Sequence, residues 1–132
     1  MIYLDSSVAL AYLLVEEHTP PATFWDESLT SSRLLEYEIW NQINARGFHR
    51  SHGDEARAMI GGVALVELTP AVLQRALEPF PKPVRTLDAL HLASIEFLRA
   101  SRQVVELASY DKRMTDAALA LGIPILAHND LV

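Results

Sequence analysis

The chain has 132 residues with 11 basic and 17 acidic side chains, a net charge of −6, and no cysteine. This length predicts a single domain over residues 1–132, large enough to bury about two-thirds of the surface that the unfolded chain exposes. The lack of cysteine excludes thiol catalysis, thiolate metal sites and a disulfide scaffold, and an acidic balance is unusual for a protein that holds nucleic acid by charge alone.

Short apolar runs alternate with helical patterns along the first third of the chain. Ser32 is predicted to cap the helix that follows it, and Gly47 to end that helix. The expected elements are a strand at 2–4, helices at 6–15 and 20–27, a strand at 29–31 and a helix at 33–46.

The same alternation continues to the end of the chain. A stiff loop with three prolines, EPFPKPV, is expected at 78–84. The remaining expected elements are a polar helix at 53–61, a strand at 63–68, helices at 70–77 and 86–99, a strand at 104–109, a helix at 112–121 and a last strand at 123–127. Strands that alternate with helices predict a parallel sheet with helices on both faces.

The chain shows no sign of a membrane or export segment. No apolar run approaches the roughly 18 residues of a membrane span. The start, MIYLDSS, has no basic stretch before an apolar one, so we expect no signal peptide and a cytoplasmic location.

Three aspartates occupy the same position relative to predicted elements. Asp5 and Asp111 each follow a strand and open a helix, and Asp88 lies in the first turn of its helix. Helix starts that follow parallel strands lie along one edge of the sheet, where ligand sites form. A glutamate from the helix at 33–46 could complete an acidic cluster there.

Each aspartate alone is better explained as a helix cap or a partner of the helix dipole. Together they favour a metal site, because two carboxylates about 4 Å apart repel by about 4 kcal/mol at an effective dielectric constant of about 20. Bound cations offset this repulsion between the carboxylates, and all-oxygen ligands point to Mg²⁺ or Mn²⁺. This chemistry suits phosphodiester hydrolysis by a metal-activated water.

Four segments of the chain resemble the PIN domain and, within it, the VapC-type toxins of bacterial toxin–antitoxin pairs. They occur in the family's order and span nearly the whole chain: MIYLDSSVALAYLL, SSRLLEYEIWNQI, RTLDALHLASIEFL and ASYDKRMTDAALALGIPI. The resemblance implies a three-layer α/β/α sandwich with a central parallel sheet. It also implies a divalent-metal-dependent endoribonuclease that cuts RNA and is inhibited by a small VapB-like antitoxin.

The resemblance also assigns roles to individual residues. It implies that Asp5, Glu38, Asp88 and Asp111 are the catalytic, metal-binding acids, and that Ser7 and Ser109 support them. Helical periodicity does not choose between Glu38 and Glu36; the family pattern favours Glu38. Asp116 could also reach the site, although a surface position on the last helix is the better interpretation.

Several other residues keep two interpretations. His91 shares a helix face with Asp88, but its apolar neighbours favour a hydrogen-bonded core or interface histidine over a metal ligand. Contact with RNA phosphates and simple exposure to solvent are equally compatible with the three arginines near the motifs, Arg33, Arg85 and Arg113.

The apolar residues also leave the partners open. Core packing is the plain interpretation of four apolar residues, Phe24, Trp25, Trp40 and Ile43. The resemblance instead favours a homodimer interface or an antitoxin groove formed by them. The main rival to a nuclease is a catalytically inactive PIN-like module that binds RNA or protein. Acids at all four matched positions favour the enzyme.

Overall fold

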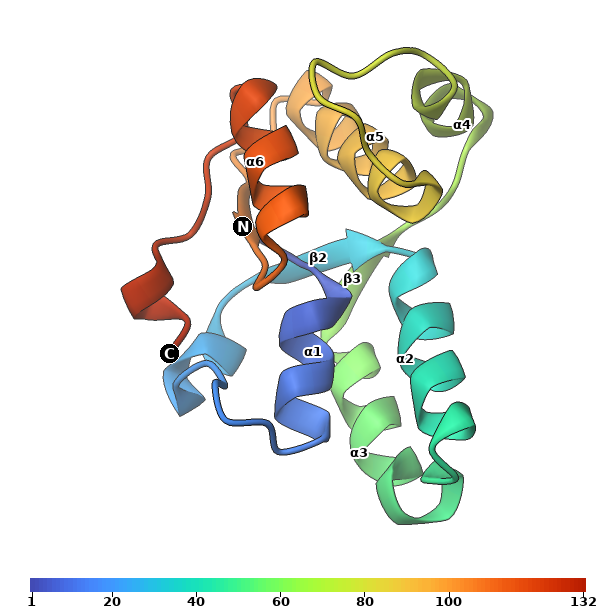
Figure 1. Ribbon diagram of the computed structural model, residues 1–132, viewed down its shortest axis with the longest axis vertical. Helices are drawn as coiled ribbons and strands as arrows, with labels where there is room; N and C mark the ends of the chain where they lie inside the picture. The colour runs from blue at the N-terminus through green and yellow to red at the C-terminus, as the bar shows by residue number, and fades with distance from the viewer.

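The structure, a computed structural model, describes residues 1–132. Helices and strands alternate along the chain as predicted (Figure 1). In chain order the elements are β1 (Ile2–Leu4), α1 (Ser6–Leu13), the 3₁₀ helix η1 (Ala22–Asp26), β2 (Leu29–Ser32), α2 (Leu34–Ala45), α3 (His49–Gly61), β3 (Val63–Val66), α4 (Pro70–Ala76), α5 (Thr86–Ala100), β4 (Glu106–Ala108), α6 (Lys112–Ala120) and the 3₁₀ helix η2 (His128–Asp130).

The four strands form one sheet in the order β3-β2-β1-β4, and all neighbouring strands are parallel. Helices α1, α2 and α3 cover one face of this sheet, and α4, α5 and α6 cover the other (Figure 1). The predicted three-layer α/β/α sandwich is therefore confirmed. Because the strands are parallel, all their carboxyl ends lie along the same edge.

Strand β1 divides its side chains between two cores, as the alternation of a strand requires. Ile2 and Leu4 pack with α1, α2 and α3, whereas Tyr3 packs with Leu92, Leu107 and other residues under α5 and α6. Fully burying a leucine or isoleucine side chain contributes about 1.5–3 kcal/mol. These two cores fix the central strand, and with it the residue that follows, Asp5.

The start of α2 follows the predicted capping chemistry. The hydroxyl of Ser32 accepts a hydrogen bond from the Leu34 backbone N–H at 3.1 Å. This bond satisfies one of the free N–H groups in the first turn of the helix. It fixes where α2 begins, and thereby which of its side chains face the sheet edge.

Two predictions of local structure are wrong, and the bounds of the other predicted elements differ from the observed ones by at most two residues. The segment at 123–127 forms an isolated bridge between Ile125 and Leu107 instead of a strand, because Pro124 has no N–H to donate and β4 ends at Ala108. Helix α3 begins at His49, not at residue 53. It runs through Gly53, where a side-chain Cβ would come within 3.5 Å of the Trp40 ring.

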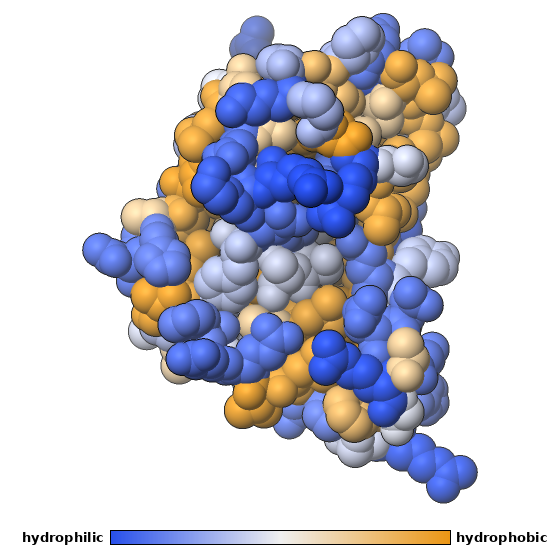
Figure 2. All heavy atoms as spheres, viewed as in Figure 1, coloured by the Kyte–Doolittle hydropathy of each residue, from blue (hydrophilic) through white to orange (hydrophobic).

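The apolar residues singled out in the sequence mostly pack inside the protein. Phe24 and Ile43 belong to the core, and Trp25 and Trp40 pack partly buried against it. Plain core packing therefore describes these side chains, and the interface interpretation is wrong for the buried ones. Figure 2 shows the exposed hydrophobic atoms of this view gathered partly over α4, at the upper right.

None of the helices combines the length and the hydropathy needed to cross a membrane.

Candidate active site

The four predicted acids meet at the carboxyl edge of the sheet. Asp5 follows β1, Asp111 precedes α6, and Glu38 and Asp88 lie in the first two turns of α2 and α5. They line one cavity of about 270 Å³, together with four other residues: Ser6, Ser7, Arg85 and Leu87. The parallel sheet thus brings together carboxylates that are up to 106 positions apart (111 − 5) in the sequence.

Asp5 is held by two serine hydroxyls. Its side chain is almost buried, and Oδ2 accepts hydrogen bonds from Ser7 Oγ at 2.6 Å and Ser109 Oγ at 2.7 Å. Although Asp5 stands at the start of α1, its side chain makes no capping hydrogen bond there. Since both hydroxyls bond Oδ2, the other carboxylate oxygen is left for a ligand in the cavity.

The two serines connect Asp5 to the chain after β4. Ser7 Oγ accepts from the Tyr110 backbone N–H at 3.0 Å, and Ser109 Oγ accepts from the Asp111 N–H at 3.0 Å. The hydroxyl that orients Asp5 therefore also fixes the backbone of Asp111. Ser7 and Ser109 both contact Asp5, and their supporting role stays a prediction.

Glu38, and not Glu36, faces the cavity. Its Oε2 accepts from Ser6 Oγ at 3.2 Å, and its Oε1 lies 2.5 Å from His91 Nε2. Glu36 lies two residues earlier on α2, outside this cavity, where it pairs with Arg33 at 3.0 Å. Helical periodicity treats the two glutamates alike, but of the two only Glu38 lines the cavity.

His91 is buried and hydrogen-bonded, as its apolar neighbours suggested. Its Nδ1 lies 2.7 Å from the Tyr3 hydroxyl, and its Nε2 contacts Glu38. Burial lowers the pKa of His91, but the hydrogen bond and negative charge of Glu38, helped by Asp5 and Asp88, outweigh it and leave this pKa raised.

Tyr3, the second hydrogen-bond partner of His91, was not predicted from the sequence. Two signals were available: Tyr3 lies two residues before Asp5, hence on the same side of β1, and His91 lies three after Asp88 on α5. Burial raises the pKa of Tyr3 far above its usual value, so its hydroxyl keeps the proton.

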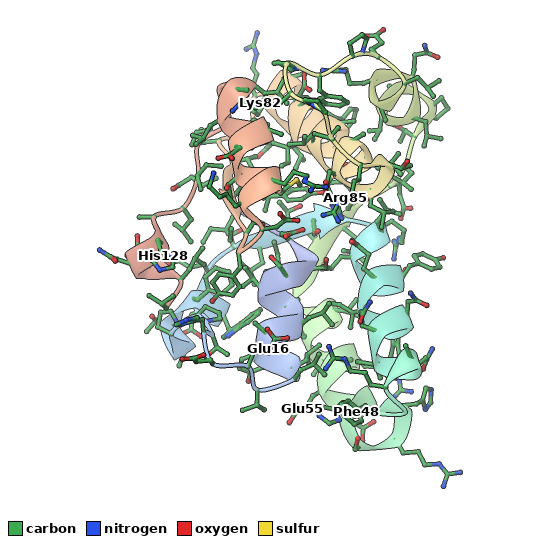
Figure 3. All side chains as sticks on the ribbon, viewed as in Figure 1. Glu16, Phe48, Glu55, Lys82, Arg85 and His128 are labelled. Atoms are coloured by element: carbon green, nitrogen blue, oxygen red, sulfur yellow. The ribbon has the colours of Figure 1, made fainter.

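Arg85 lies between the remaining two acids. Its Nη2 donates to Asp111 Oδ2 at 3.1 Å, and its Nε is 3.5 Å from Asp88 Oδ2. Figure 3 labels the Arg85 side chain, which lies beside the start of α5. The other Asp111 oxygen caps α6 by accepting from the Arg113 N–H at 3.0 Å. Asp111 thus combines the cap and a side chain that faces the cavity.

The acids do not converge as three ligands around one point in this arrangement. The Arg85 guanidinium balances the charge of Asp88 and Asp111. By donor type the residues fit a divalent ion, because carboxylate and hydroxyl oxygens from separate elements line the cavity. Withdrawal of the exposed Arg85 side chain would free two of these acids.

The other residues considered lie outside this cavity. Arg33 is held by Glu36 and Glu67. Asp116 pairs with Lys112 at 2.8 Å on the surface of α6, in line with the surface position expected for it. Of the three arginines named above, Arg85 alone lines the cavity.

Comparison with known proteins gives the same picture. The sequence profile of the PIN domain matches residues 2–120. Ribonuclease VapC46 of Mycobacterium tuberculosis (strain ATCC 25618 / H37Rv) is 33% identical over 130 residues, 96% of each chain. Ribonuclease VapC47 of Mycobacterium tuberculosis (strain CDC 1551 / Oshkosh) is 27% identical over 129 residues, 92% of this chain and 93% of its own. With its matched profile, its α/β/α layers and its cluster of acids, the chain belongs to the PIN domain family.

Proposed function

We propose that this protein is a divalent-metal-dependent endoribonuclease of the VapC type. The observation that carries the proposal is the cavity at the sheet edge, into which four separate segments place Asp5, Glu38, Asp88 and Asp111. The relatives named as ribonucleases match this chain over nearly its whole length, which supports RNA as the substrate.

The four acids would hold Mg²⁺ or Mn²⁺ through oxygen ligands. When bound, the cation supplies an activated water and stabilises charge on the oxygens of the scissile phosphate. The task of the protein is to orient the acids. Ser7 and Ser109 orient Asp5, and Ser6 and His91 each bond one oxygen of Glu38. No side chain of the site needs to act as a covalent nucleophile.

Arg85 has two roles in this proposal. Without a cation it neutralises Asp88 and Asp111, and once a cation takes over that task its guanidinium is free to bind an RNA phosphate. Arg113, next to Asp111, is a second candidate for phosphate contact. Arg33 is the weakest of the three because Glu36 and Glu67 already hold it.

The first prediction tests the metal requirement. Purified protein is expected to cut single-stranded RNA with Mg²⁺ or Mn²⁺ and to stop in EDTA, because the proposed nucleophile is a metal-activated water. Analysis of the product ends should find 5′-phosphates and 3′-hydroxyls. Cleavage that continues in EDTA, or products with 2′,3′-cyclic phosphates, would contradict the mechanism.

A catalytically inactive PIN-like module that binds RNA or protein is the alternative. The observation in its favour is the Arg85 side chain, which already balances the charge of two of the acids. The same assay separates the two functions, since an inactive module would retain RNA without cutting it at any Mg²⁺ or Mn²⁺ concentration.

We further propose a small VapB-like antitoxin as protein partner. The acidic cavity would attract an arginine or lysine of the antitoxin. Apolar residues next to that basic residue of the antitoxin would pack on a hydrophobic surface of this protein. Co-expression with a small adjacent gene is expected to give a stable complex without nuclease activity, measured by co-purification and RNA cleavage. Separate elution of the two proteins with full activity would oppose this partner.

The exposed apolar surface near α4 supports a homodimer of chains that are each a single PIN-like domain. A cavity of about 780 Å³ lies between α4, the proline loop and α5, lined by Leu73, Leu77, Phe80 and Val84 among others. Leu77 is 80% exposed and Leu73 43%. A second copy would bury this surface.

A further inference from the structure

A buried chain of three polar side chains runs from the core under α5 to the wall of the acidic cavity. Tyr3 comes from β1, His91 from α5 and Glu38 from α2. The Tyr3 hydroxyl lies 2.7 Å from His91 Nδ1, and His91 Nε2 lies 2.5 Å from Glu38 Oε1. Each of the three layers of the fold therefore contributes one member.

The Tyr3 and His91 side chains lie among apolar side chains. Tyr3 is fully buried and His91 is 1% exposed, among neighbours such as Leu92, Ile95 and Leu107. A buried polar group without a partner costs roughly 1–3 kcal/mol. Tyr3 and His91 avoid this penalty by bonding each other and, through the second imidazole nitrogen, Glu38.

The hydrogen-bond directions make His91 a donor to Glu38. A carboxylate only accepts, so Nε2 must carry a proton. In the neutral imidazole, Nδ1 then accepts from the Tyr3 hydroxyl; in the imidazolium, Nδ1–H donates to the same oxygen. Tyr3 satisfies Nδ1 in either case, and Nε2–H remains directed at Glu38.

Both ring nitrogens are therefore occupied, which leaves none to bind a metal ion directly. Glu38, by contrast, is held from two sides, since Ser6 Oγ bonds its Oε2 and His91 bonds its Oε1. A long, flexible side chain is thus fixed in one rotamer at the cavity wall.

We propose that His91 is a positioning residue that holds the Glu38 carboxylate in the orientation required for metal binding, whereas Tyr3 only satisfies the second imidazole nitrogen. This inference rests on the proposed function, because it assumes that Glu38 is a metal ligand. Outer hydrogen-bond partners of metal ligands typically change metal affinity or activity by about 10–100-fold when they are removed.

The test compares two amides at position 91 by calorimetric titration with Mn²⁺ alone. The amide of glutamine is as many bonds from the backbone as Nε2, so His91→Gln can still donate to Glu38. The amide of asparagine corresponds to Nδ1, so His91→Asn reaches Tyr3 only. Mn²⁺ binding is expected to weaken about 10–100-fold in His91→Asn and to stay near that of the wild type in His91→Gln.

Tyr3→Phe is the matched control for stability. It removes the buried hydroxyl and lowers the thermal midpoint, but Nε2–H still points at Glu38, so Mn²⁺ affinity should stay near that of the wild type. A role of His91 in folding alone would instead weaken Mn²⁺ binding in step with the melting temperature in all three variants. That pattern would overturn the proposal.

A measurement on the metal-free protein keeps the inference testable if the variants at position 91 do not fold. The His91 Nε2–H proton should give a strongly downfield NMR signal that Glu38→Gln shifts and Glu36→Gln leaves in place. Absence of this signal, or a signal whose chemical shift does not change in Glu38→Gln, contradicts the inference. If wild-type protein binds Mn²⁺ and cuts RNA in that case, the proposed function stands and the role of His91 alone is rejected; no Mn²⁺ binding by wild-type protein rejects both.

Discussion

The Glu38→Gln variant is expected to lose RNA cleavage by about a thousandfold and to need far more Mg²⁺ for the activity that remains. One unit charge about 4 Å from another contributes about 4 kcal/mol at an effective dielectric constant of about 20. Each 1.4 kcal/mol corresponds to about tenfold in rate or affinity. The amide keeps the shape of the side chain and can keep its contacts with Ser6 and His91, so the loss should come from the charge.

Glu36→Gln is the matched control, made by the same chemical change two residues away. Glu36 pairs with the partly exposed Arg33, which keeps Glu67 as a second partner. An exposed ion pair of this kind contributes little to stability. We therefore expect little change in folding and none in the dependence of cleavage on Mg²⁺.

The measurement is the cleavage rate of both variants against Mg²⁺ concentration, with thermal melts in EDTA to check folding. A normal Mg²⁺ curve for Glu38→Gln together with an inactive Glu36→Gln would reverse the assignment. Full activity of both variants would mean that α2 supplies no ligand, and the proposed set of four acids would be wrong.

The layers of the fold could be predicted from the sequence because its strands are short apolar runs followed by helix starts. The same pattern located Asp5 and Asp111, since a residue that follows a parallel strand lies at the sheet edge. Asp88 was found from its place in the first turn of a predicted helix, and it too lines the cavity. These predictions depended on local sequence, which is why they agree with the structure.

Features that depend on tertiary contacts could not be predicted in the same way. The pairing of Glu36 with Arg33, and of Glu38 with His91, separates two glutamates that helical periodicity treats alike. Gly53 lies inside α3 and packs beside the Trp40 ring of α2, a contact between two helices. In neither case is the deciding partner visible as a pattern within one element.

Arg85 shows the same limit at the site itself. Its position three residues before Asp88 predicts an interaction within one helix turn, but its stronger hydrogen bond is to Asp111, 26 positions away. That contact depends on how α5 and α6 meet at the sheet edge.

The second large effect is expected for Asp5→Asn. Ser7 and Ser109 both donate to Asp5 Oδ2, so the asparagine carbonyl oxygen should take that position to accept the same two hydrogen bonds. Its NH₂ group would then face the cavity, where it offers donors to a cation and carries no charge. Cleavage should fall about a thousandfold on the same charge estimate, with the fold retained.

Ser7→Ala and Ser109→Ala provide the graded comparison, because each removes one hydroxyl from Asp5 and leaves its charge. Losses of about 10–100-fold are expected for such outer partners. Ser109→Ala should be the more damaging, since Ser109 also accepts from the Asp111 N–H and so fixes a second acid. Cleavage rates and Mn²⁺ titrations of the three variants, with melts in EDTA, give the order. An Asp5→Asn protein that folds and still cuts RNA as well as Ser7→Ala would show that Asp5 is no metal ligand and that its two serines serve the turn after β4 alone.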